Sequence, residues 1–264
     1  MTKSNGRHWL MATVLAGITG VGNAADTPAS APTDATAAVD PAAIEALGAM
    51  SSYLRSLSQY AIDADITKDQ VIDGNGKLQF DRELKILFAR DKGLSVDSSS
   101  VQRHLQYFYD HKQITLYTPG KQVYTSIDAP ATIAAAMALV EEKYDLSIPL
   151  SDIFYWGTDK LPTDDIEAAF FVGPGRVRGQ DCRHYAYRQA DIDWQLCITD
   201  GDQPLPLKLV ITTTDVAIQP QYTATLKWNL NPTISTDSFR FTPPAGVSKI
   251  SIQPIAATTP ADGE

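Results

Sequence analysis

The side chains best suited to bind a metal or to react lie in one stretch, DCRHYAYRQADIDWQLCI at 181–198. This stretch holds both cysteines of the chain, Cys182 and Cys197. His184 lies two residues after the first cysteine. A Cys-x-His pair on one strand with a second cysteine opposite offers ligands that suit zinc or copper. The same cysteines could instead form a disulfide across a β-hairpin or remain free thiols. The spacing by itself leaves these three interpretations open.

The N-terminus favours the disulfide because it is typical of a secretory leader. Lys3 and Arg7 precede an uncharged run from Trp9 to Val21, and small residues extend to Ala24, as in a signal peptide that is cleaved after that position. The run is shorter than the roughly 20 apolar residues that span a bilayer. We therefore expect a periplasmic or secreted protein without a retained membrane span, in a compartment where disulfides form.

A hairpin that places Cys182 opposite Cys197 also sorts the other side chains by polarity. Tyr185 then lies opposite Trp194 on one face, and the cysteines share the other face with His184, because alternate residues of a strand point to opposite faces. The sequence predicts that the aromatic face points into the core and that the cysteine face points outward.

Other candidates for catalysis are weak. The chain has no G-x-S-x-G, H-E-x-x-H, C-x-x-C or phosphate-binding glycine loop, the motifs that commonly mark enzyme and cofactor sites. His104 and His111 flank a predicted strand, and we expect His111 in a solvent-exposed turn. Asp63 and Asp65 alternate with apolar residues, which predicts a solvated face. We predict no catalytic residue, no bound metal and no cofactor.

The charge of the chain narrows the class of partner. Its formal net charge is -9, and it becomes -11 without the leader, which holds two basic residues and no acidic one. Such a balance argues against binding to nucleic acid or to an anionic membrane surface. The hydrophobic content of 44% is enough to build a core.

The chain after the leader divides into a tether, one domain and a tail. Residues 25–40 are rich in Ala, Thr, Pro and Asp and predict a disordered linker; we also expect a disordered tail at 253–264. The segment 41–252 predicts a single domain. Its apolar spacing predicts the helices 41–57, 130–144 and 149–157.

Short strands occupy the rest of this domain. Period-two alternation and turn residues predict strands at 60–67, 77–88, 93–97, three within 104–127, and 166–172, 182–188, 193–199, 207–214, 222–229 and 239–241. Consecutive strands with short turns pair antiparallel. We therefore predict an α+β fold: a single large curved antiparallel sheet, a half-barrel of about 11–12 strands, with a few helices covering its concave face.

Several segments carry a family resemblance: ALGAMSSYLRSLSQYAIDADIT, LQFDRELKILF, YFYDHKQITLYTPGKQVYTSIDAPATI, LSDIFYWG, PLPLKLVITTTD and PQYTATLKWNL. They resemble a bacterial family of predicted periplasmic proteins catalogued as a domain of unknown function, over residues 44 to 241. Such proteins are similar to the LolA/LolB-type lipoprotein-carrier superfamily. The resemblance implies a half-barrel closed by helices over an apolar cavity that binds an acyl chain, a lipid or a lipoprotein.

The apolar stripes and the aromatic residues supply the candidates for such a cavity. The predicted lining residues are Leu47, Met50, Leu54, Arg82, Ile133, Met137, Val140, Phe154, Trp156 and Trp194. Arg82 is the one basic residue that the alternation places on an apolar face, unless a bulge or register slip returns it to solvent. We expect an exported binding protein that carries or senses a lipid; the alternative is an interaction or envelope-stress sensor domain with a filled core and an envelope protein as partner.

Overall fold

The computed structural model describes residues 38–72, 76–146, 148–157, 163–235 and 237–255. The chain divides into two units, Met1–Ala35 and Thr36–Glu264, and every described residue lies in the second. The predicted leader, almost all of the predicted linker and the last residues of the predicted tail lie outside the described residues.

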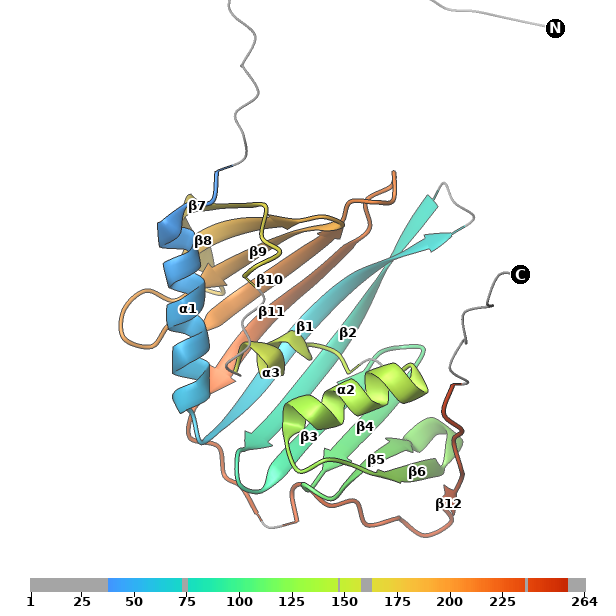
Figure 1. Cartoon of the computed structure of the whole chain (residues 1–264). Helices are drawn as coiled ribbons and strands as arrows, with labels where there is room; N and C mark the ends of the chain where they lie inside the picture. Colours follow the sequence, from blue (N-terminus) through green and yellow to red (C-terminus); the bar gives the residue numbers. More distant parts are fainter. Residues whose placement is uncertain (1–37, 73–75, 147, 158–162, 236, 256–264) are drawn as a thin grey trace, which may run out of the picture. The chain divides into compact units, whose positions relative to one another are not determined.

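One sheet dominates the described part of the chain (Figure 1), and its twelve strands follow the order β12-β6-β5-β4-β3-β2-β1-β11-β10-β9-β8-β7. In chain order the elements are α1 (Pro41–Ser56), β1 (Gln59–Ile72), β2 (Gly76–Ala89), β3 (Gly93–Ser99), β4 (His104–Tyr109), β5 (Gln113–Thr118), η1 (Pro119–Lys121), β6 (Val123–Asp128), α2 (Ile133–Tyr144), α3 (Asp152–Trp156), β7 (Ala168–Val177), β8 (Gln180–Gln189), β9 (Ile192–Ile198), β10 (Pro206–Thr213), β11 (Gln221–Asn229) and β12 (Ser248–Lys249).

The first strand lies in the middle of the sheet rather than at an edge. β1 pairs antiparallel with its chain neighbour β2 and, on its other side, with the distant β11. Ala64 therefore lies between Leu84 and Leu226, and all three side chains are buried. This pairing joins the strands β1–β6 to the strands β7–β11 in one continuous sheet.

The three helices all lie on one face of the curved, unclosed sheet (Figure 1). The helix α1 begins where Asp40 caps it, since the Asp40 carboxylate accepts a hydrogen bond from the Ala42 N–H at 2.9 Å. The Tyr187 hydroxyl of β8 donates to the Ala43 carbonyl at 3.0 Å and so fixes α1 to the sheet. Apolar side chains of the helices and of the covered sheet face form one core. The predicted fold class is confirmed.

The structure confirms the disulfide between Cys182 and Cys197 but not the predicted hairpin register. His184, rather than Cys182, lies opposite Cys197, and Tyr187 lies opposite Trp194. The strands are shifted by two positions relative to the predicted pairing, which leaves residues 190–191 as a tight turn and keeps every side chain on its predicted face. The two cysteines are therefore bonded diagonally, with 5.5 Å between their Cα atoms.

The face that carries the cysteines is more covered than the sequence predicted. Cys182 and Cys197 are only 4% and 6% exposed and pack with Leu207, Val177 and Trp228 in a small second cluster. The Trp228 indole donates to the Pro206 carbonyl at 2.7 Å, which holds its ring in place. The disulfide is thus packed into the protein, and Trp228 contacts both this cluster and the main core.

The predicted last strand at 239–241 is wrong. Phe239 lies in a turn with 2% of its surface exposed, and the two prolines that follow Thr242 lack the N–H groups that a ladder needs. The last strand is instead β12, which pairs parallel with β6. Phe241 packs its ring against Tyr124 of β6 at a centroid distance of 5.0 Å.

Candidate functional site

A pocket of about 240 Å³ lies where the three helices meet the sheet. Its helical walls come from Leu54 of α1, Ile133 of α2 and Phe154 of α3. Its sheet wall is the pair Tyr60 and Phe88, whose rings stack at 4.5 Å. The remaining lining residues are Arg90, His111, Ala131, Thr132, Ala134, Ile153 and Gly157. The inner part of the pocket is therefore apolar.

The helices α1 and α3, which both line the pocket, are joined by a buried hydrogen bond as well as by packing. The Ser51 hydroxyl of α1 donates to the Trp156 carbonyl at the end of α3 at 2.5 Å. The segment before α2 is fixed in a similar way, because the Tyr109 hydroxyl of β4 donates to the Pro130 carbonyl at 2.6 Å. The first contact fixes α3 to α1, and the second fixes the segment before α2 to the sheet.

The rim of the pocket is polar. Arg90 donates from its Nη2 to the Arg55 carbonyl at 2.6 Å and to the Leu57 carbonyl at 2.9 Å, so its guanidinium also closes the C-terminal end of α1. Burial raises the pKa of Tyr60, and the nearby charge of Arg90 acts in the opposite direction. A cation therefore lies at the edge of an otherwise apolar pocket.

His111 lies at this rim. The sequence had predicted a position in a solvent-exposed turn. Its backbone has a φ of 66°, and its ring lies 5.1 Å from that of Tyr109. The Nδ1 atom is 2.8 Å from the Ala131 carbonyl and donates to it. The Nε2 atom is buried and has no hydrogen-bond partner among the described residues. The expectation failed because the segment before α2 folds back over the turn.

The nine apolar residues among the predicted cavity residues divide into two groups. Leu54, Ile133 and Phe154 line the pocket. The other apolar candidates are buried in the core without lining it: Leu47, Met50, Met137, Val140, Trp156 and Trp194. Contact of any of them with a ligand stays a prediction.

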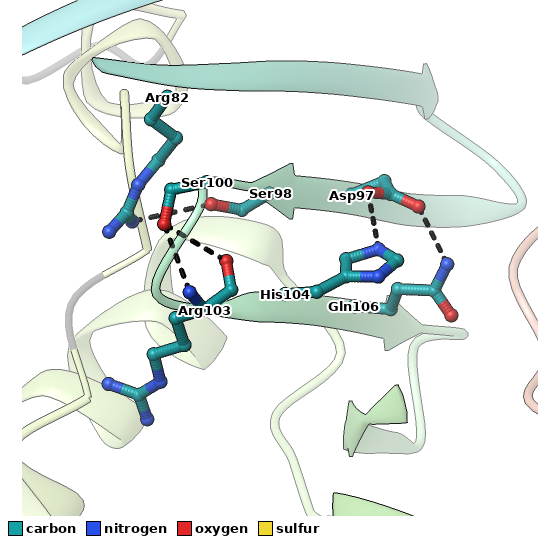
Figure 2. A network of polar contacts seen from close by, with 7 residues as sticks. All are labelled: Arg82, Asp97, Ser98, Ser100, Arg103, His104 and Gln106. Carbon is teal, nitrogen blue, oxygen red and sulfur yellow. Dashed lines mark hydrogen bonds and ion pairs between the residues drawn. The ribbon is translucent and has the colours of Figure 1, made fainter. Parts of the chain in front are cut away.

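Arg82 follows neither pattern. It is half-buried on the helix-covered face, on the same side of β2 as Leu84 and Ile86. Its Nη1 donates to the Ser98 hydroxyl of β3 at 3.3 Å (Figure 2). No bulge interrupts the pairing of β1 with β2, and Arg82 does not line the pocket under the helices. The hydrogen bond to Ser98 thus holds the Arg82 guanidinium against β3.

Sequence reasoning missed nine of the twelve residues that line the pocket, and four of them show why. Tyr60 and Phe88 lie at the ends of strands whose alternation was visible, so the available signal was their position next to the first helix. Arg90 and His111 lie in turns, where periodicity gives no information about which way a side chain points. Their place at the pocket depends on contacts with residues distant in the chain: Leu57 is 33 positions from Arg90, and Ala131 is 20 positions from His111.

The opposite face carries one His–Asp pair that invites a catalytic interpretation. His104 Nε2 lies 2.9 Å from the Asp97 carboxylate, which also accepts from the Gln106 amide at 2.6 Å (Figure 2). Within the described residues no hydroxyl or thiol hydrogen-bonds to His104, whereas a nucleophile and its base lie within hydrogen-bond reach. The arrangement is that of a half-exposed hydrogen-bonded cluster on the sheet surface.

Two further properties concern metals and membranes. In the described part of the chain, no group of three or more His, Cys, Asp or Glu side chains is placed to hold a metal ion, and the disulfide occupies both cysteines. No helix among the described residues has the length and apolar character needed to cross a membrane.

These features define the class of protein: an open, curved, mostly antiparallel sheet with helices over one face, the fold that the resemblance to the LolA/LolB type implied. The chain belongs to the family described as Predicted periplasmic protein (DUF2092), whose sequence model matches residues 43–253. The family description places the protein in the periplasm, as the leader predicted.

Solved structures with low sequence identity resemble the fold. LprF from Mycobacterium bovis is 11% identical with a TM-score of 0.45, and the match covers 75% of this chain and 97% of that one. An uncharacterized conserved protein from Thermus thermophilus is 10% identical with a TM-score of 0.47, covering 79% and 98%. A LolA superfamily protein from Nitrosomonas europaea is 8% identical with a TM-score of 0.38, covering 75% and 97%. Such scores assign no ligand. No curated protein matches the chain.

Proposed function

We propose that this protein is a periplasmic binding protein that holds the acyl chain of a lipid or lipoprotein in the pocket under its helices. The observation that carries the proposal is the pocket itself, about 240 Å³ with aliphatic and aromatic inner walls. Burial of apolar ligand surface stabilises a complex by roughly 25 cal/mol per Å². An acyl chain gains this free energy without any matching polar group.

The size of the pocket limits what it can hold. Its volume of about 240 Å³ is just below the roughly 300–1,000 Å³ of most small-molecule sites. It therefore accommodates part of one acyl chain, and a longer chain requires one wall to move. The helix α2 is the wall best suited to this, because it buries only the narrow stripe of Ala136, Met137 and Val140.

Lipid extraction tests this proposal directly. We expect mass spectrometry of the exported protein, purified without detergent, to detect lipids carrying acyl chains. We also expect added lipid to raise the melting temperature, since ligand at one hundred times its Kd adds about 2.7 kcal/mol to the free energy of unfolding. The absence of both effects would contradict the proposal and favour an interaction domain with a filled core.

A substitution pair locates the site. We expect Ile133→Trp to fill the pocket and to weaken binding of a fluorescent fatty-acid probe by about tenfold or more, a loss of about 1.4 kcal/mol. Leu139→Trp is the matched control, because Leu139 lies on the same helix and is half-buried without lining the pocket. Equal binding by both variants would place the ligand elsewhere.

A further inference from the structure

We infer that the ligand of this pocket is an amphiphile with one acyl chain and a compact anionic head, a carboxylate or a phosphate. The head would lie between the Arg90 guanidinium, the first turn of α2 and the His111 ring. This inference rests on the proposed function and adds to it the charge of the ligand's polar end. Three features of the rim support it independently.

The first feature is the guanidinium of Arg90. Its Nη2 is engaged with the Arg55 and Leu57 carbonyls, which orients the planar group at the rim. A guanidinium has five N–H donors and no acceptor, and within the described residues no partner is observed for the Arg90 Nε and Nη1 atoms. These donors are suited to the two oxygens of a carboxylate or phosphate, which arginine binds in pairs.

The second feature is the N-terminal end of α2, where residues 131–134 line the pocket. Thr132 caps the helix by accepting a hydrogen bond from the Ala135 N–H at 3.4 Å. The N–H groups of Ile133 and Ala134 have no partner within the helix, as is general for a first turn. The end of a twelve-residue helix also carries a partial positive charge that stabilises an anion.

The third feature is the imidazole of His111, which lines the same pocket. Its Nδ1 is bonded to the Ala131 carbonyl, while its Nε2 is buried without a partner among the described residues. A buried polar atom without a hydrogen bond is costly. The polar head of the ligand would supply the missing partner.

The charges around the rim agree with an anionic head. A neighbouring recess shares His111 and Ala131 with the pocket and is lined by Lys92, Arg240, Asp91 and Asp110 among others. The Asp110 carboxylate is already engaged, because it accepts from the Lys112 and Gln113 N–H groups and lies 3.9 Å from Arg240. Within this recess Lys92 and Arg240 face two carboxylates, and Arg90 adds a further cation at the adjoining pocket rim, in a chain whose net charge is -9.

Calorimetric titration with three twelve-carbon probes tests the inference. Dodecanoate, dodecyl phosphate and dodecanol share one chain and differ in the head. We expect the better of the two anions to bind the unmodified protein at least about tenfold more tightly than dodecanol, the factor that one charge-assisted hydrogen bond supplies. Whichever anion binds more tightly identifies the head as carboxylate or phosphate.

A matched pair of variants tests the position of the head. Ala134→Asp and Ala134→Asn add side chains of nearly equal size to the first turn of α2, and only the first adds a negative charge. An acidic residue at this end stabilises a helix, and the melting temperatures of both variants check that folding is preserved. We expect Ala134→Asp to abolish the preference for the anion over dodecanol and Ala134→Asn to retain it.

Arg90→Gln provides a second test, with Lys92→Gln as the control that removes a neighbouring cation outside the pocket lining. We expect only Arg90→Gln to lower the preference for the anion. If the unmodified protein binds dodecanol as tightly as the better of the two anions, the inference is overturned and the proposed function stands. If none of the three probes binds, the proposed function fails and the inference fails with it.

Discussion

At the scale of the residue, Asp69 shows how one carboxylate joins three strands. It lies near the end of β1 and is 7% exposed. It accepts hydrogen bonds from the Gln79 amide of β2 at 3.3 Å and from the Gln221 N–H of β11 at 3.1 Å, and it pairs with Lys77 at 2.8 Å. The hydrogen bond from Lys77 is the largest of the causes that lower the pKa of Asp69.

This shift predicts a dependence of stability on pH. A carboxyl group whose pKa is lowered by folding stabilises the native state above its unfolded pKa, and the stabilisation is lost as the pH falls through the folded value. We expect Asp69→Asn to lower the free energy of unfolding at pH 7 and to matter less below about pH 4, near the ordinary pKa of an aspartate. Urea unfolding at both pH values checks this.

The exposed Asp63 of the same strand provides the control. Asp63→Asn is expected to change the free energy of unfolding by less than about 0.5 kcal/mol, as is usual at the surface. A constant difference between the unmodified protein and Asp69→Asn at both pH values would show that the carboxylate contributes nothing through its charge.

At the scale of the element, the disulfide and Gly175 constrain each other at the edge of the sheet. Gly175 of β7 lies opposite Cys182 of β8. A Cβ atom at position 175 would lie 2.8 Å from the Cys197 sulfur and 3.3 Å from the Cys182 sulfur. The first distance is shorter than ordinary van der Waals contact, so only glycine lets β7 pass over the disulfide.

This contact predicts coupled effects of two changes. Removing the disulfide by Cys182→Ala with Cys197→Ala is expected to cost about 3 kcal/mol, the chain-entropy value for a loop of some fifteen residues. Gly175→Ala is expected to destabilise the oxidised protein and to cost much less in the background without cysteines, since the clashing sulfurs are gone. Thermal unfolding of the four proteins measures this coupling, and additive effects would contradict it.

At the scale of the whole molecule, an open sheet has two edges that must be protected from further pairing. On one side the short strand β12 covers β6, where the Ser248 N–H donates to Gln122 at 3.0 Å and the Ile250 N–H donates to Tyr124 at 2.8 Å. At the other edge, β7 has a bulge between Phe171 and Gly173 and a proline at position 174, both of which discourage pairing.

Removal of the C-terminal cover tests this role of β12. We expect a chain truncated after Pro243 to expose the edge of β6, to melt at a lower temperature and to self-associate in size-exclusion chromatography. A chain truncated after Ile255 keeps β12 and is expected to behave as the full chain does. A monomeric and equally stable protein ending at Pro243 would show that β6 needs no cover.

Much of the architecture could be predicted from the sequence because it depends on local patterns. Alternation placed the β1 and β2 side chains on their correct faces, and the helix predicted at 41–57 begins at the same residue as α1, Pro41. The disulfide followed from the leader and from two cysteines on one predicted face. The hairpin register was wrong by two positions because a shift of two leaves the polarity of each face unchanged.

The sequence by itself therefore determined most of the secondary structure, the antiparallel class of sheet, the helix-covered face and the disulfide. Only the tertiary structure decided that β1 pairs with β11, that α2 lies over the pocket with its first turn at the rim, and that Arg90 and His111 meet there. The physical reason is that periodicity reports which face of an element is apolar, whereas a pocket forms where faces distant in the chain fail to fill the space between them.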